Sequence, residues 1–86
     1  MNNRERLAPD DLCADGLDDA IVGVAEIFTE RGTTVRKVLY DRAKVIDILM
    51  ARGLSEESAE EYFSFNIGGA YVGEQTPLYV DMPFGV

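Results

Sequence analysis

Four glutamates form the densest group of side chains in the sequence that could take part in acid–base chemistry or binding. Glu56 and Glu60 are four residues apart, as are Glu57 and Glu61, so a helix would place them one turn from each other. Paired carboxylates can act as acid and base where burial raises the pKa of one of them, but this run is polar throughout. The cluster therefore predicts either a solvated helix face or an acidic patch that binds a partner.

The charge distribution favours a positively charged partner. The formal net charge is −8: residues 1–30 hold eight acids and two bases, residues 31–52 two acids and six bases, and residues 53–86 six acids and no base. Phosphate backbones and anionic membranes repel such a surface, so we expect no direct binding to nucleic acid or membrane. Asp18 and Asp19 are candidates to extend the patch. The alternative is that the acids only keep a small protein soluble and monomeric.

Nucleophilic and metal chemistry lack their usual residues here. The sequence has no histidine, which excludes Ser-His and Cys-His pairs and makes a zinc site unexpected. The single cysteine, Cys13, has Asp10, Asp11 and Asp15 near it, and negative charge disfavours its reactive thiolate. One cysteine also allows no intrachain disulfide, as is usual for a reducing compartment. We therefore expect no enzyme, no catalytic residue, no metal and no cofactor.

A glycine-rich run at 68–73 is the remaining motif that could bind a ligand. It lacks the spacing and the lysine-serine ending of a phosphate loop, so close packing and a turn are the favoured interpretation. Asn66, on the apolar side of the expected helix, predicts a buried amide bonded to backbone, with ligand binding as the alternative. Gly73, Glu74 and Thr76 then predict a turn and the start of a strand, or a ligand-reading loop.

The apolar spacing predicts a helix from Asp15 to Gly32. Asp15 can cap its amides, and Asp18 and Asp19 suit the positive end of its dipole. Apolar residues then recur at steps of three and four: Leu17, Ala20, Ile21, Val24, Ile27 and Phe28. Gly32 is the expected helix stop.

Clear boundary signals mark the later elements. β-favouring residues predict a strand over 33–40, and Asp41 and Gly53 predict the two ends of a second helix. Ser55 before two acids predicts the start of a third helix, closed by about residue 73. A second strand is expected over 78–82.

The expected fold class is α+β, with three helices packed on a small two-stranded antiparallel sheet in the order α-β-α-α-β. Residues 1–14 form an irregular N-terminal arm, and residues 15–86 one compact domain. The chain has 86 residues, 47% of them apolar, which suits a single core. It contains no apolar run of the roughly 20 residues that span a bilayer and no signal-peptide pattern, so we expect a cytoplasmic protein.

Residues 35–80 resemble a group of small proteins encoded by tailed bacteriophages. The resemblance rests on five stretches: Val-Leu-Tyr-Asp at 38–41, Ile-Asp-Ile-Leu-Met at 46–50, Ser-Glu-Glu-Ser-Ala-Glu-Glu-Tyr-Phe at 55–63, Phe-Asn-Ile-Gly-Gly-Ala-Tyr-Val-Gly-Glu at 65–74, and Thr76-Pro77. It implies a phage setting and the cytoplasm of the host cell, and it implies no particular reaction. Small acidic phage proteins without catalytic residues are similar in size and charge to anti-defence and anti-CRISPR inhibitors.

Two function hypotheses follow. The first is an inhibitor that binds a host defence or nucleic-acid-handling protein, meaning a basic protein or nucleoprotein complex, through the acidic surface. The second is a phage accessory or structural protein that self-associates as a homo-oligomer through an apolar patch near the C-terminus. Candidate patch residues are Tyr71, Tyr79, Met82 and Phe84.

Overall fold

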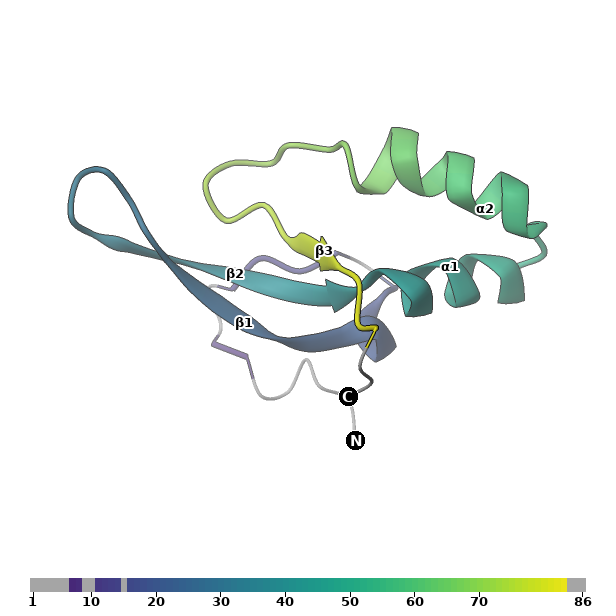
Figure 1. Ribbon diagram of the computed structural model, residues 1–86, viewed down its shortest axis with the longest axis horizontal. Coiled ribbons are helices and arrows are strands. Elements are labelled where there is room, and N and C mark those ends of the chain that lie inside the picture. The colour runs from purple at the N-terminus through teal and green to yellow at the C-terminus, as the bar shows by residue number, and fades with distance from the viewer. Residues whose placement is uncertain (1–6, 9–10, 15, 84–86) are drawn as a thin grey trace.

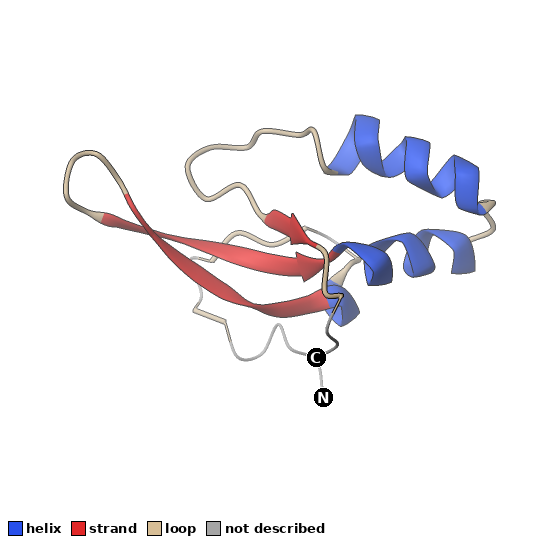
Figure 2. Cartoon of the chain, viewed as in Figure 1, coloured by secondary structure: helices blue, strands red, loops and turns tan. Residues whose placement is uncertain are grey.

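A computed structural model describes residues 7–8, 11–14 and 16–83 (Figures 1 and 2). Within them the chain is α+β. Its elements are a 3-10 turn η2 (Asp18–Ala20), strands β1 (Ile21–Phe28) and β2 (Thr34–Asp41), helices α1 (Arg42–Ala51) and α2 (Glu56–Tyr62), a π-helical turn η3 (Phe63–Ile67) and strand β3 (Leu78–Val80). Two helices and a three-stranded mixed sheet, in the order β-β-α-α-β, correct the prediction of three helices on a two-stranded antiparallel sheet.

The predicted first helix is wrong because most of its residues form β1. Four of the eight residues of β1 are β-branched and one is phenylalanine, and such side chains suit a pleated strand better than a helix. The strand pairs antiparallel with β2, with Val24 opposite Val38 and Glu26 opposite Arg36. The apolar spacing of three and four also fits a strand whose two faces are both partly covered. Only η2 keeps a helical conformation.

A tight turn joins β1 to β2. The Thr29 amide donates to the Thr33 carbonyl at 2.8 Å, and the two threonine hydroxyls lie 2.8 Å apart. Gly32, expected to end a helix, instead supplies the positive φ of 80° that this turn requires. The hairpin projects away from the helices (Figure 1), and the molecule measures 43 × 29 × 26 Å.

β2 is the central strand of the sheet, whose order is β1-β2-β3. The strand predicted over 33–40 is confirmed with a shift of one residue, whereas the strand predicted over 78–82 is limited to β3. β3 pairs parallel to β2, with Leu39 opposite Leu78 and Asp41 opposite Val80. A parallel pair needs a long crossover, and α1, η3 and α2 supply it.

The helix starts expected at Asp41 and Ser55 are confirmed. The Asp41 carboxylate accepts from the Ala43 amide at 3.0 Å, and the Ser55 hydroxyl accepts from the Ser58 amide at 3.2 Å. Gly53, with a φ of 107°, follows the end of α1 as expected. The last helix ends earlier than predicted, because α2 passes into η3 after Tyr62.

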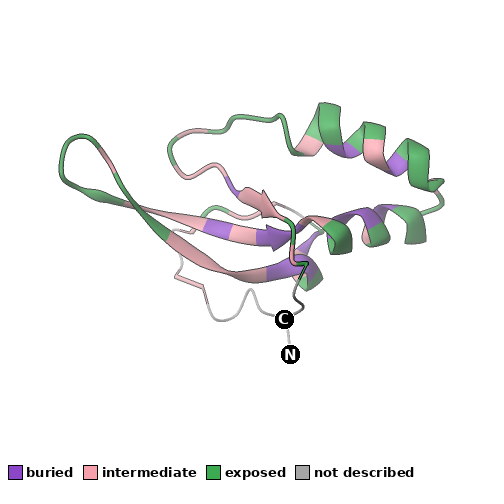
Figure 3. Cartoon of the chain, viewed as in Figure 1, coloured by how far each residue is buried: buried purple, intermediate pink, exposed green. Residues whose placement is uncertain are grey.

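The two faces of the sheet differ in burial (Figure 3). On one, here called the core face, Val38 and Tyr40 are 1% and 0% exposed and pack with side chains of α1, α2 and η3. The other, here called the second face, alternates with it along each strand. Its residues are Gly23, Ala25, Ile27, Val35, Lys37, Leu39, Asp41, Leu78 and Val80. Asp41, which caps α1, is 7% exposed, and the others are half-buried or exposed. None of them belongs to the hydrophobic core of the described chain.

The N-terminal segment lies on the core face. The Ala14 amide donates to the Tyr40 hydroxyl at 2.7 Å, and the Arg36 guanidinium bonds both oxygens of Asp11 at 2.9 and 3.0 Å. These contacts hold 11–14 against β2. No helix in the described part of the chain is long and apolar enough to cross a bilayer.

Candidate functional site

Three of the four clustered glutamates are presented to solvent by α2. Glu56, Glu57 and Glu61 are exposed, and none of them is ion-paired within the described residues. The Ser55 cap fixes the start of the helix, so Glu56 and Glu57 lie in its first turn beside the free amides. Their role as a partner-binding surface stays a prediction, and a merely solvated face has the same geometry.

Glu60 differs from the other three because it is paired with Arg42. The Arg42 guanidinium bonds the Glu60 carboxylate at 2.5 Å and also lies 5.2 Å from the centre of the Phe63 ring. Arg42 opens α1, so this one side chain links the start of α1 to α2 and to η3. Glu60 is thus paired inside the fold, and the acidic surface without ion pairs in the described residues consists of the other three carboxylates.

The π-helical turn η3 decides which aromatic side chains are buried. Phe63 is 7% exposed and packs edge-on against Tyr79 with ring centres 5.1 Å apart, while Tyr79 stacks on Tyr40 at 5.4 Å. A Cβ on Gly68 would lie only 2.8 Å from the Phe63 ring, so this glycine permits the close approach. Gly68 therefore serves close packing, within its own helical segment and not between a helix and the sheet as the sequence had suggested.

The same segment leaves large apolar side chains exposed. Phe65 is 83% exposed, Tyr71 78%, Val72 60% and Tyr62 46%. All four lie within residues 62–72, directly after the acidic helix. Single exposed apolar residues are ordinary, but four in eleven residues favour a surface that another protein covers. Phe65 was not among the predicted site residues, although helical spacing already places it on the side of the helix opposite Ala59 and Phe63.

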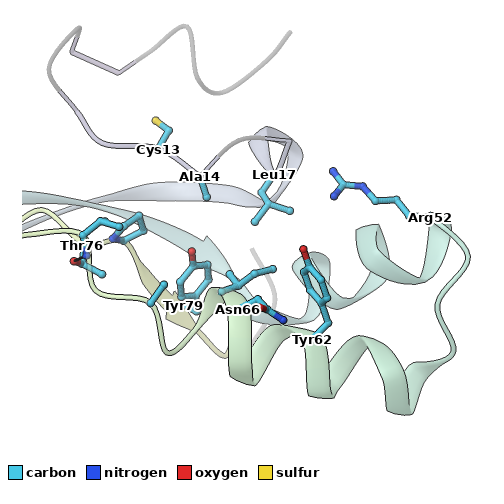
Figure 4. A pocket seen from close by; sticks show the side chains of 12 residues that line it. Cys13, Ala14, Leu17, Arg52, Tyr62, Asn66, Thr76 and Tyr79 are labelled. Atoms are coloured by element: carbon cyan, nitrogen blue, oxygen red, sulfur yellow. Dashed lines mark hydrogen bonds between the residues drawn. The ribbon is translucent and has the colours of Figure 1, made fainter.

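A hollow of about 210 Å³ lies between the N-terminal segment and the 62–79 region (Figure 4). Arg52 and Tyr62 lie toward one end, and Thr76 toward the other. The Arg52 guanidinium already donates to the Gly16 carbonyl at 2.9 Å. The volume is below the range of about 300–1,000 Å³ usual for small-molecule sites. The hollow has room for one large side chain and places no acid–base pair around it.

Asn66 contributes to this hollow but is not buried. The prediction of a buried amide bonded to backbone is wrong, since Asn66 is exposed. The π-turn rotates it away from the core side that an uninterrupted α-helix would have given it. Cys13, also at the hollow, is half-buried.

The loop around Gly73 is held by its own hydrogen bonds. The Thr76 hydroxyl donates to the Gly73 carbonyl at 2.6 Å and accepts from the Val72 amide at 2.9 Å, and Gly73 has a φ of 114°. Glu74 pairs with Arg31 of the hairpin turn at 2.7 Å, with both side chains well exposed. The hydrogen bonds of Thr76 hold the turn at Gly73, and Thr76 also lines the hollow. A ligand-reading role of Gly73, Glu74 and Thr76 stays a prediction.

Asp18 and Asp19 lie in η2, which packs against α1. Asp18 is half-buried and Asp19 is exposed, so only Asp19 presents its carboxylate fully to solvent. They belong to a different element from the acids of α2, and their role in partner binding stays a prediction.

Burial and hydrogen bonding shift the pKa values of two groups that hold the N-terminal segment, Tyr40 and Asp11. Desolvation raises the pKa of Tyr40 to about 12, which keeps its hydroxyl neutral and able to accept from Ala14. The hydrogen bond from Arg36 lowers the pKa of Asp11 below its usual value, although burial opposes this. Both groups hold the N-terminal segment in place, and neither forms part of a reactive pair.

The predicted C-terminal patch is only partly present. Tyr71 is exposed, but Tyr79 is half-buried within the aromatic stack and Met82 is half-buried. Phe84 lies outside the described residues. Within those residues, no group of three Cys, Asp or Glu side chains is placed to hold a metal ion.

Comparisons with known proteins leave the family of the chain open. No protein-family model matches it, and neither the curated proteins nor the solved structures contain a significant match. The function is therefore argued from the geometry above.

Proposed function

We propose that the chain acts by binding a protein partner through the surface that α2 and residues 62–72 present. The observation that carries this proposal is the exposure of Phe65, Tyr71 and Val72 directly after three free carboxylates. Exposed apolar side chains supply binding free energy when a partner covers them. A polar surface around them keeps the free protein soluble.

The carboxylates would set the specificity and the association rate. Glu56, Glu57 and Glu61 repel acidic proteins and steer a basic surface toward the aromatic residues. The hollow beside Tyr62 could accept one anchor side chain of the partner. A partner of this chemistry has a basic groove or patch with an apolar residue near its centre.

The resemblance of residues 35–80 to tailed-phage proteins supports a more specific version. In that setting the partner is a host defence protein or a nucleic-acid-handling complex, whose basic groove the chain would occupy as an anti-CRISPR-like inhibitor. The net charge of −8 supports this version, because grooves that bind nucleic acid are basic. The site of action would be the cytoplasm of the host cell.

Charge reversal tests the proposal. The chain, immobilised, is exposed to lysate of a bacterial host, and retained proteins are compared between the natural chain and the variant Glu57→Lys/Glu61→Lys. A partner of the acidic surface is lost from the variant and released from the natural chain by high salt. The matched control is Glu30→Lys/Asp47→Lys, which makes the same change of charge at exposed positions on the hairpin turn and on α1.

A second variant separates the apolar contribution. Phe65→Ala should weaken binding of the same partner at every salt concentration, because truncating an exposed apolar anchor leaves the charges unchanged. Retention that survives both Phe65→Ala and the charge reversal would refute the proposed surface.

A further inference from the structure

Beyond the irregular pairing at Ile21–Gly23, the edge strand β1 lacks lysine and proline, two of the usual protections against pairing. Among the described residues it pairs only with β2, so one side of its backbone is at the edge of the sheet. Natural edges are commonly blocked by lysine, proline or inward-pointing charge. From Val22 to Phe28 the strand has no lysine and no proline, and its single charge is Glu26, which pairs with Arg36 of the neighbouring strand at 3.6 Å.

The edge also lacks the charge that would keep two copies apart. Residues 21–41 contain three acids (Glu26, Glu30 and Asp41) and three bases (Arg31, Arg36 and Lys37), so the hairpin is formally neutral in a chain of net charge −8. The excess acid lies elsewhere. The strand ends in two exposed apolar residues, Ile27 at 37% and Phe28 at 81%. A neutral, apolar edge favours a second identical strand over a charged peptide.

We propose that two copies of the chain pair antiparallel along β1, with the two-fold axis at Ala25. An axis at Glu26 would place this carboxylate opposite itself, which is destabilising. An axis at Val24 would bring the irregular pairing between Ile21 and Gly23 into the interface. The axis at Ala25 avoids the first and leaves Ile21 outside the interface. It places Glu26 opposite Val24 of the second copy.

This register also keeps the two faces of the sheet distinct. Because residues directly opposite each other share a face, Gly23 lies opposite Ile27 of the second copy, and both belong to the second face. The result is a continuous six-stranded sheet whose second face is twice as wide. A strand edge of this length buries less than a standard interface, so the dimer is weak and depends on concentration. This surface differs from α2 and residues 62–72, so the inference does not depend on the proposed partner.

Sedimentation velocity tests the dimer. The purified full chain is measured from about 1 µM to about 500 µM, the range in which weak small interfaces dissociate. The natural chain should shift from monomer to dimer. Ala25→Lys should remain monomeric, because it places two like charges together at the axis. The control is Val80→Lys, which also places a lysine on the second face but on β3, away from the β1 edge. It should dimerise like the natural chain. If Val80→Lys abolishes the dimer, the two copies instead pack against each other through their second faces.

A disulfide reports the register directly and does not depend on the fold of the lysine variant. In a Cys13→Ala background, Ala25→Cys should form a cross-linked dimer under mild oxidation, because the two-fold axis places the two cysteines directly opposite each other, and a small shift brings their Cβ atoms to the distance of about 3.5–4.5 Å that a disulfide spans. Glu26→Cys should not, because its partner position is Val24. A natural chain that stays monomeric throughout, or equal cross-linking at 25 and 26, would overturn the proposal.

Discussion

The two faces of the sheet use similar apolar residues for different purposes. On the core face, Val38 and Tyr40 are fully buried beneath the N-terminal segment and η3. On the second face, Val35 and Leu39 come from the same strand but are only half-buried and lie outside the core. Alternation along β2 thus separates residues that form the core from residues that lie outside it.

The segment that follows α2 repeats this contrast within three residues. Phe63 packs against Tyr79, whereas Phe65 is 83% exposed. The difference shows that apolar content alone does not measure the core of this chain. Its radius of gyration of 13.5 Å exceeds the value of about 12 Å expected for a compact domain of 86 residues, as a projecting hairpin requires.

The largest difference between the two regions is expected for the two phenylalanines. Phe63→Ala should lower the free energy of unfolding by about 3 kcal/mol, because it removes a buried ring and leaves a cavity beside Tyr79. Phe65→Ala should change it by less than about 0.5 kcal/mol. Urea unfolding followed by circular dichroism measures both. Equal losses would show that Phe65 also packs in solution.

The next contrast compares the two faces of β2. Val38→Ala should cost about 2 kcal/mol, since Val38 is 1% exposed and well packed. Val35→Ala, on the second face, should cost about 0.5 kcal/mol in the monomer. The measurement is the unfolding midpoint at low protein concentration. A Val35→Ala cost as large as that of Val38→Ala would mean that the second face is covered within one chain.

A smaller effect is expected at the glycine that admits the Phe63 ring. Gly68→Ala adds a methyl group whose carbon would lie 2.8 Å from that ring, so the ring must shift. The cost of overpacking, partly offset by the better helical propensity of alanine, should leave a net loss of about 1 kcal/mol. Gly32→Ala is an unsuitable comparison, because its positive φ adds strain of another kind. A stabilised Gly68→Ala would contradict the packing described for η3.

The smallest expected effect concerns the attachment of the N-terminal segment at low pH. The Arg36 hydrogen bond lowers the pKa of Asp11 in the folded chain, so its contribution to stability is present above the unfolded pKa of about 3.9. It is lost as pH falls through the lower, folded pKa. Asp11→Asn should therefore be less stable than the natural chain near pH 6, and the two should converge near pH 2. If the difference in stability between Asp11→Asn and the natural chain does not change with pH, the charge of the Asp11 carboxylate does not contribute to the contact.

Local signals in the sequence predicted local structure well. Asp41, Gly53 and Ser55 mark helix boundaries because a cap depends on a few neighbouring atoms. The interpretation of residues 15–32 failed because strand formation there depends on pairing with β2. The parallel direction of β3 depends on where two helices return the chain, which no short pattern encodes.

The acidic part of the candidate site could be predicted from the sequence, because the charged residues are read directly from it. A run of glutamates following a serine cap predicted an acidic helix face, and the three free carboxylates lie on it. The pairing of Glu60 with Arg42 could not be predicted, because it depends on the angle between α1 and α2. The exposure of Asn66 follows from the π-turn, which has about one more residue per turn than an α-helix and so changes the direction of the side chains after Phe63.

The parallel pairing of β3 with β2 also sets an order of folding. The hairpin closes through contacts between near neighbours such as Phe28 and Thr34, and hairpins form within about 1–10 µs. β3 must wait until residues 42–77 have crossed over, a loop closure that costs far more entropy. During synthesis on the ribosome, the hairpin therefore exists with both of its edges unpaired until residue 80 has emerged. In that interval the nascent chain exposes the most unpaired strand backbone and is most prone to aggregate. Rapid completion of the last strand limits this aggregation.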